Sequence, residues 1–319
     1  LAVMHIEVTL LDGSAPIVIS SQLLNRQDGE DEYHVPSAAL GEGRDPRQAQ
    51  RFDHRVLQPR LARNAEVPGD TASADGGRQV TLGYRCTNSG MTLACAYRHV
   101  IDTDCGYRVR TTVDPDHAKS VFTFDAHAGE TIRITKFVTY HTSRGTPAEE
   151  LADRCTRTLD RALDEGRAQI YEQQQRWLDE FWADSDVEIT GDAAAQQAVR
   201  WNLFQLAQAS ARTHEQGIAA KAVTAGGYDG HYFWDTEVYV LPFLAYTNPE
   251  AARKLLRFRY HMLDAARRRA TELSQRGALY PWRTINGEEA SAYYAAGTAQ
   301  YHINAAVVYA LEKYLNATG

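Results

Sequence analysis

The sequence predicts a multidomain protein in which a β-sandwich precedes a helical domain, and three observations indicate this order. Residues 1 to about 145 hold short segments rich in Val, Ile, Thr, Tyr and Phe, separated by turn residues and with no helical pattern between them. Apolar residues recur at helical spacing between Pro147 and Asp184, and again from Ala193 onward. We therefore expect an antiparallel β-sandwich over residues 1–146, a helical linker over 147–186 and a helical domain over 187–319.

Six segments of the first region are expected to be strands. In the first, four apolar residues alternate with polar ones from Met4 to Leu10, which is typical of a half-buried strand. The others are RQVTLGYRC, MTLACAYRHV, YRVRTTVD, SVFTFDAHA and TIRITKFVTYHT. The polar stretches 41–51 and 69–78 are expected to be loops. Because the chain enters a strand pattern directly after Leu1, we expect a larger protein and a sandwich that lacks its first strands.

The helical region contains residues that predict where helices break and begin. Gly166 interrupts the apolar pattern of the linker. Asn248 is expected to cap a helix that has Pro249 in its first turn and Glu250 where the helix dipole favours an acid. The buried side of this helix is expected to carry Leu255, Met262, Ala266, Ala270 and Leu273, and that of the last helix Ile303, Val307, Ala310, Leu311 and Tyr314.

Composition and charge exclude several classes of partner. The chain has 319 residues, a net charge of −7 and 44% hydrophobic residues, which argues against nucleic acid or an anionic membrane as the main partner. No apolar run approaches the ~20 residues that cross a bilayer. The four cysteines form no CxxC motif, and no signal-peptide pattern precedes the first strand. We therefore expect free or buried thiols in a cytoplasmic protein.

The most unusual stretch is GGYDGHYFWDTEVYVLPF, residues 226–243. Phe233, Trp234 and Asp235 stand together here, and this combination suits a sugar. The C–H face of a sugar lies on an aromatic ring, and carboxylates hold its hydroxyls in charge-assisted hydrogen bonds. If the stretch is helical from His231, then His231 and Asp235 share a face, as do Phe233 and Glu237; if it is a loop, nearly all of it can face a cavity. The alternative to sugar binding is that the rings only pack in the core.

A second polar-aromatic stretch, YPWRTINGEEASAYYAAGTAQYH, covers residues 280–302. It contains Trp282, Arg283, Glu288 and His302 and almost no large aliphatic residue. Two such stretches, each leading towards a helix, predict a carbohydrate pocket on a helical scaffold. The alternative is a loop that packs on its neighbours.

Other ligands have little support in the sequence. His231 and Asp235 could bind a metal ion, but no third ligand is evident, so we expect no metal site. No GxxxxGK loop occurs, and no GxGxxG motif follows a strand.

These two stretches, together with WNLFQLAQAS and KLLRFRYHMLDAARRRA, resemble glycoside hydrolase family 65, which contains inverting phosphorylases of α-glucosides and a few hydrolases. The similarity runs from about Val187 to the end and more faintly through the preceding part. PWRTINGEE with GTAQYHIN is more similar to the trehalose-phosphorylase side of the family. The resemblance implies that residues 187–319 form the first part of an (α/α)6 catalytic barrel.

The resemblance also implies a reaction. Phosphate attacks the anomeric carbon of an α-linked glucose disaccharide with inversion, and one carboxylic acid protonates the leaving oxygen, which gives glucose 1-phosphate. The family's general acid lies in a motif similar to DEYHE, which does not occur here. We therefore expect no catalytic residue in this chain, a general acid beyond Gly319, and no activity of the chain alone.

By resemblance, Trp234 and Asp235 match residues that hold the non-reducing glucose, and Trp282 and Arg283 shape the leaving-sugar site. We expect the substrate-binding set Phe233, Trp234, Asp235, Trp282, Arg283, Glu288 and His302. The sequence departs from the family pattern at Ala306, where relatives carry Asp, and at Arg283, where many carry Glu.

The expected partners are a small disaccharide and inorganic phosphate as co-substrate, with no cofactor and no metal. We expect a homodimer for the longer protein. One alternative is a hydrolase of the same family that releases free glucose, and another is a carbohydrate-binding module without catalysis.

Overall fold

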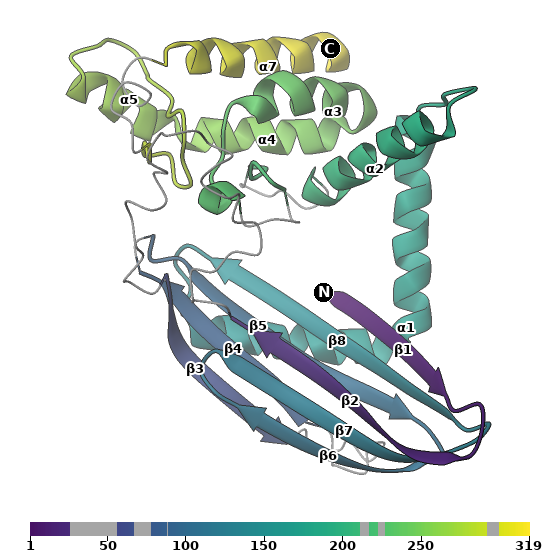
Figure 1. Ribbon diagram of the computed structural model, residues 1–319. Helices are drawn as coiled ribbons and strands as arrows, with labels where there is room; N and C mark the ends of the chain where they lie inside the picture. The colour runs from purple at the N-terminus through teal and green to yellow at the C-terminus, as the bar shows by residue number, and fades with distance from the viewer. Residues whose placement is uncertain (26–55, 67–77, 88, 211–216, 223–226, 292–299) are drawn as a thin grey trace, which may run out of the picture. The chain divides into compact units, whose positions relative to one another are not determined.

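The computed structural model describes residues 1–25, 56–66, 78–87, 89–210, 217–222, 227–291 and 300–319 (Figure 1). The chain divides into two compact units, Leu1–Gln173 and Gln174–Gly319. The division falls inside a long helix, α1 (Ala148–Ser185). This helix covers most of the range 147–186 that was expected to be a linker. The expected loop at 41–51 and all but the last residue of the one at 69–78 lie outside the described residues.

The first unit contains two antiparallel sheets, as the sequence predicts. One has the strand order β1-β8-β5-β4-β3 and the other β2-β7-β6. The strands are β1 (Ala2–Thr9), β2 (Ser14–Leu24), β3 (Leu57–Glu66), β4 (Arg78–Cys86), β5 (Thr92–Asp102), β6 (Gly106–Val113), β7 (His117–His127) and β8 (Thr131–Ser143). The six predicted strands are all present, whereas β2 and β3 were not predicted. Pro16 in β2 and the polar residues of β3 weaken the strand pattern there.

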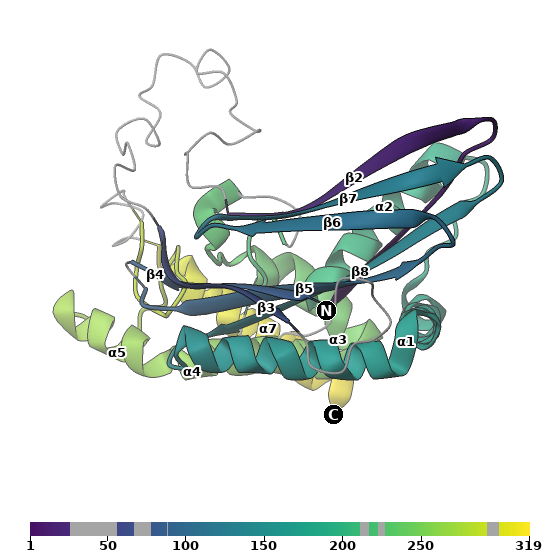
Figure 2. The ribbon, with the colours of Figure 1, turned by 90° about the horizontal axis from the view of Figure 1, so that it is seen from below.

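The first unit has three layers, which Figure 2 shows as the three-stranded sheet, the five-stranded sheet and α1. Strand β5 shows why. Cys95 and Tyr97 pack in the core between the sheets, whereas Ala94 and Ala96 pack against a cluster that includes Leu159 of α1. The small alanines let the helix approach the sheet, so the central strand is buried on both faces.

The first segment is a strand, as predicted, but two of the side chains expected to be buried are exposed. Met4 and Ile6 are each 50% exposed. β1 is an edge strand that pairs only with β8 among the described strands. Its other face is the more covered one, because Val3 packs against the cluster that contains α1.

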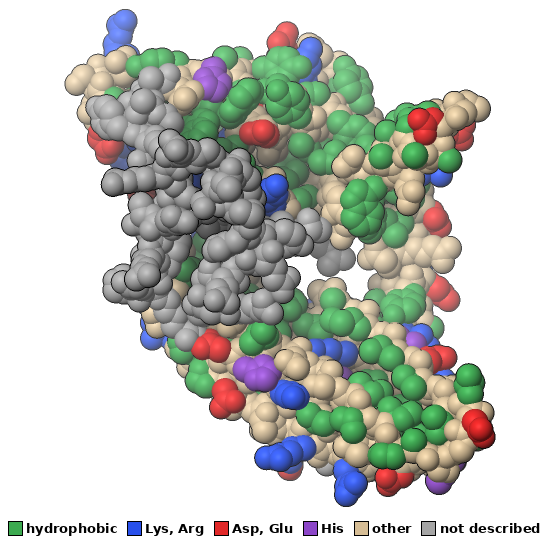
Figure 3. All heavy atoms as spheres, viewed as in Figure 1, with side chains coloured by type: hydrophobic (Ala, Val, Ile, Leu, Met, Phe, Trp, Pro, Cys, Tyr) green, Lys and Arg blue, Asp and Glu red, His purple; other side chains and the backbone are tan. Residues whose placement is uncertain are grey.

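The first unit carries the predicted break in the linker helix and the predicted free thiols. Gly166 has φ 77° and ψ 159°, so it kinks α1 where the sequence pattern is interrupted. All four cysteines are free thiols. None of the helices in the described ranges has the length and apolarity that a membrane span requires. On the face of the first unit seen in Figure 3, charged side chains of both signs are scattered among hydrophobic ones.

Partly buried His99 makes the stability of the first unit depend on pH. Its ring lies 4.9 Å from that of Phe122, and its Nε2 lies 2.9 Å from Ser21 Oγ. Burial, together with the nearby charge of Lys136, lowers its pKa from 6.5 to about 3. The unfolded chain therefore takes up this proton first, and stability that is fully present above pH 6.5 is lost as the pH falls towards 3.

We expect the wild type to lose roughly 2 kcal/mol more than His99→Gln between pH 6.5 and 5, because each pKa unit corresponds to ~1.4 kcal/mol. Gln cannot titrate but retains a hydrogen-bonding group for Ser21. Denaturant unfolding at both pH values measures the difference. Equal losses in the two proteins would show that His99 becomes protonated without unfolding.

The second unit is helical. Its α-helices are α2 (Ala193–Ser210), α3 (Leu241–Thr247), α4 (Pro249–His261), α5 (Leu263–Glu272) and α7 (His302–Thr318). Leu244 of α3, Leu255 of α4 and Ala310 of α7 belong to one buried cluster. The predicted cap is confirmed, since Asn248 Oδ1 accepts a hydrogen bond from the backbone N–H of Ala251 at 3.1 Å.

Two predictions for these helices need correction. The expected helix from Pro249 to Leu273 is divided at Met262, which ends α4 and begins α5. Leu311, expected on the buried side of the last helix, is 45% exposed, because Ile303 and Ala310 define the buried face of α7.

Candidate functional site

The two polar-aromatic stretches of the sequence meet in the second unit. Tyr232 and Thr284 form an isolated antiparallel bridge, in which Tyr232 N donates to Thr284 O at 2.8 Å and Thr284 N donates to Tyr232 O at 3.2 Å. Beside this bridge, the rings of Phe233 and Trp282 meet edge to face with their centroids 5.3 Å apart. Two segments far apart in the sequence therefore form one site.

The first stretch is not helical from His231, so one of the two predicted arrangements is wrong. A 3₁₀ turn at Gly227–Gly230 leads into an extended segment, and a π-helix follows at Thr236–Val240. His231 and Asp235 consequently do not share a helical face. Single turns of π-helix are rare in proteins, and those that occur are often found at functional sites. Pro242, which has no N–H to donate to a preceding turn, lies just beyond it.

Trp234 and Asp235 occupy the junction between the extended segment and the π-helix. The ring of Trp234 is partly buried and meets the ring of His302 edge to face at 5.0 Å. The ring of Tyr239 is also near that of Trp234, with the ring centroids 6.2 Å apart and the planes tilted by 41°. Asp235 is exposed and caps no backbone N–H. The junction thus presents an aromatic ring held by two neighbours beside an accessible carboxyl group.

Arg283 lies over the turn that begins the first stretch. Its Nη2 is 3.2 Å from His231 Nδ1 and 3.5 Å from the carbonyl oxygen of Tyr228. His231 Nδ1 is also 2.8 Å from this carbonyl oxygen. Tyr228 has φ 59°, a left-handed conformation that is uncommon outside glycine and turns its carbonyl towards these donors. The contacts hold the guanidinium against the first stretch.

Glu289 holds the backbone of the second stretch. Its carboxylate accepts hydrogen bonds from the backbone N–H groups of Trp282 at 2.7 Å, Arg283 at 3.2 Å and Ser291 at 3.0 Å. Three donors to one carboxylate fix the loop in a single shape. Glu288, by contrast, is exposed and accepts a hydrogen bond from Asn286 within the same turn at 3.2 Å.

Of the seven predicted site residues, the described contacts link Phe233 with Trp282 and Trp234 with His302. Asp235 adjoins Trp234, and Arg283 reaches the first stretch through His231. Glu288 has no described contact with this group. The predicted set did not include Glu289, which fixes the loop, or Arg259, which occupies a buried position of α4. The available signal for Arg259 was its spacing of four residues from Leu255 on the apolar face.

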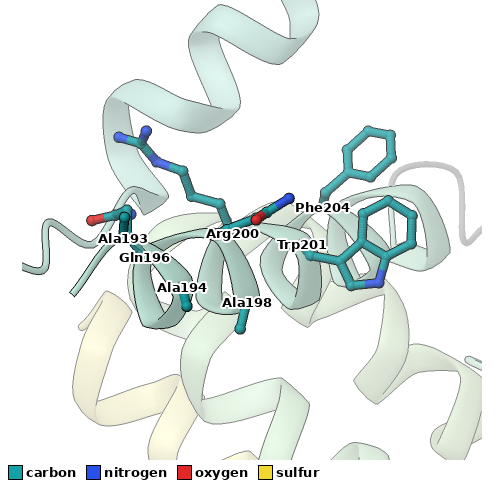
Figure 4. A pocket seen from close by; sticks show the side chains of 8 residues that line it. Ala193, Ala194, Gln196, Ala198, Arg200, Trp201 and Phe204 are labelled. Atoms are coloured by element: carbon teal, nitrogen blue, oxygen red, sulfur yellow. The ribbon is translucent and has the colours of Figure 1, made fainter.

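A separate surface hollow of about 680 Å³ lies on α2 and contains none of the predicted site residues. Its lining side chains rise from this one helix (Figure 4). Trp201 and Phe204 supply its apolar part, and its charged residue, Arg200, is paired with Asp186. In the part of the chain that the structure describes, no carboxylate that could accept hydrogen bonds from sugar hydroxyl groups lines this hollow. We therefore place the candidate site at the two polar-aromatic stretches. The described residues also contain no group of three or more side chains able to hold a metal ion.

Comparison with known proteins identifies similar chains. Residues 1–181 match the model of the glycosyl hydrolase family 65 N-terminal domain, and residues 200–319 match that of the family 65 central catalytic domain. The α,α-trehalose phosphorylase of Thermoanaerobacter brockii is 46% identical over 230 residues, which are 72% of this chain and 30% of that protein. The kojibiose phosphorylase of the same organism is 35% identical over 210 residues, which are 62% of this chain and 27% of the relative.

A solved structure named "Putative kojibiose phosphorylase from human microbiome" has a similar fold. It matches with a TM-score of 0.77 and 24% identity, over 98% of this chain and 37% of that one. The chain therefore spans about 30% of the length of the curated relatives that it matches.

Proposed function

Because the chain belongs to glycosyl hydrolase family 65, we propose that it is part of an enzyme that cleaves a trehalose-like α-linked glucose disaccharide by phosphorolysis with inversion. The products are glucose 1-phosphate and a free sugar. The observation that carries the proposal is the accessible carboxyl group of Asp235 beside the partly buried ring of Trp234. The similarity to α,α-trehalose phosphorylase supports the choice of substrate.

In this proposal the non-reducing glucose lies against Trp234, and Asp235 accepts hydrogen bonds from its hydroxyl groups. His302 braces the ring of Trp234, and Phe233 braces that of Trp282. Trp282 forms a wall of the leaving-sugar site, and Arg283 donates to the hydroxyls of that sugar. Glu288 is exposed, and in this proposal its carboxylate contacts the second sugar.

The chemistry needs one acid and one nucleophile. Inorganic phosphate is already an anion, so it attacks the anomeric carbon without a general base, and a carboxylic acid protonates the departing glycosidic oxygen. We propose that this acid lies beyond Gly319 in a longer protein. We propose further that the helices of the second unit begin an (α/α)6 barrel, and that the longer protein is a cytoplasmic homodimer without metal or organic cofactor.

We expect the 319-residue chain alone to release no glucose 1-phosphate from trehalose and phosphate, because it lacks a DEYHE-like motif for the acid. The longer protein is expected to release one glucose 1-phosphate for each glucose. A coupled assay of both products measures this, with a family 65 trehalose phosphorylase as the positive control. Glucose 1-phosphate made by the chain alone would show that the acid lies within residues 1–319.

The same assay separates the alternatives. A hydrolase of the family would release two glucose molecules and no glucose 1-phosphate. A carbohydrate-binding module would bind the disaccharide and leave it intact even in the longer protein.

A further inference from the structure

We infer that Glu237 and Arg259 form a positioning device that sets the geometry of Trp234 and Asp235. The inference rests on the proposed sugar site and adds two residues to it. Neither residue is accessible to a ligand, because their side chains are only 3% and 2% exposed. Their effect on a sugar must therefore pass through the residues between them and the surface.

The geometry is that of a clamp on both ends of one short segment. Arg259 Nε donates to Glu237 Oε1 at 2.7 Å, and its Nη2 donates to Glu237 Oε2 at 2.9 Å. The same Nη2 also donates to the backbone carbonyl of Phe233 at 3.2 Å. Phe233 and Glu237 flank Trp234 and Asp235 in the sequence. One guanidinium from α4 thus holds the residue directly before the proposed sugar-binding pair and the residue two positions after it.

The segment needs such a clamp because no regular secondary structure sets its path. Tyr232 forms the β-bridge, Trp234 lies in a turn, and the helical backbone that begins at Asp235 continues as a π-helix from Thr236. The hydrogen bonds of Glu237 N and Val238 N to the carbonyl of Trp234, at 3.1 and 3.3 Å, fix only the first turn of that helix. The carbonyl of Phe233, one residue before Trp234, accepts neither of these two hydrogen bonds. Arg259 binds it and joins the extended part to the helix.

Stability alone does not account for a buried ion pair. Removing two charges from water is costly, and a well-packed apolar pair of similar volume is often neutral or stabilising in comparison. An apolar pair cannot, however, bind the carbonyl of Phe233 or orient a carboxylate through two parallel hydrogen bonds. The pair therefore has a consequence for geometry that can be separated from its consequence for folding.

The double substitution Glu237→Met/Arg259→Met separates the effect of the ion pair on geometry from its effect on folding. Arg259→Lys is a second variant for the same test. Lysine keeps the charge but loses the planar fork that reaches two acceptors at once. In the longer protein we expect the double variant to unfold within a few degrees of the wild type, while kcat/KM for trehalose phosphorolysis falls at least about tenfold. We expect Arg259→Lys to show a similar kinetic loss. As a matched control, removal of the Asp186–Arg200 ion pair by Asp186→Asn/Arg200→Met should leave kcat/KM unchanged.

A second measurement needs no activity and uses the 319-residue chain. The chain has five tryptophans, so ¹⁹F NMR of protein labelled with 5-fluorotryptophan gives few resonances, and Trp234→Phe assigns the relevant one. We expect Arg259→Lys and the double variant to shift or broaden the Trp234 resonance and to leave that of Trp201 in place. An unmoved Trp234 resonance, or unchanged kinetics in a folded double variant, would overturn the positioning role.

Asp235→Ala distinguishes this inference from the proposed function. If Asp235→Ala removes activity and the double variant retains it, the positioning role is refuted and the sugar site stands. If the Trp234 resonance moves in the clamp variants but Asp235→Ala leaves the activity unchanged, the clamp is present and the assignment of the sugar site is wrong.

Discussion

Asp235→Ala is expected to lower kcat/KM for the disaccharide at least about 10²-fold in the longer enzyme. A charged hydrogen bond contributes about 1.5–3 kcal/mol, and a carboxylate that holds two hydroxyl groups loses both such bonds on truncation. The carboxyl group of Asp235 is exposed and caps no backbone N–H, so its removal should not disturb the fold. Steady-state kinetics of phosphorolysis, with Tm measured in parallel, test the prediction.

Asp264→Ala provides the matched control. Asp264 is also an exposed aspartate near the start of a helix of the second unit, but its carboxylate pairs with Arg267 at 3.2 Å. This variant should retain wild-type kinetics. Near-wild-type kinetics in a folded Asp235→Ala variant would instead make Asp235 a structural residue.

Arg283→Glu is expected to change which disaccharide the enzyme prefers. A guanidinium donates to two neighbouring hydroxyls in a fixed fork, whereas a carboxylate can only accept. A site built for hydrogen bonding rejects a sugar that leaves its polar groups unpaired. We therefore expect the ratio of kcat/KM for trehalose to that for kojibiose to change by about 10²-fold or more, since one or two charged hydrogen bonds are exchanged.

The test compares trehalose, kojibiose, nigerose and maltose, with glucose 1-phosphate as the common product. Arg283→Gln keeps a donor without reversing the charge and should change the ratios less. Arg268→Glu, on the exposed side of α5, controls for the change in net charge. A uniform fall for all four sugars would mean that Arg283 only stiffens the loop through its contacts with His231 and Tyr228.

The β region could be predicted from the sequence because strands depend on local patterns. Alternation of apolar and polar residues identified β1, and enrichment in β-branched and aromatic residues identified β4, β5, β6, β7 and β8. The same reasoning misjudged the burial of Met4 and Ile6. Alternation shows that a strand has an apolar face, but whether another sheet or helix covers this face is decided by residues elsewhere in the chain.

The composition of the candidate site could likewise be predicted, since its two stretches combine aromatic and polar residues in a way that a core or a solvated loop seldom does. Their meeting could not be predicted. The bridge between Tyr232 and Thr284 and the ring contact between Phe233 and Trp282 join segments that are distant in sequence. Local patterns contain no information about the partner across such a distance.

The sequence by itself thus determined the order of β and helical regions, the Asn248 cap, the break at Gly166, and the residue types that could bind a sugar. Only the tertiary structure decided how these residues are held. Arg259 appears in the sequence as one more charge on an amphipathic helix, yet it is 2% exposed and binds Glu237 and the carbonyl of Phe233. A buried charge is tolerated only where partners from another segment satisfy it, and those partners become visible only when the chain is folded.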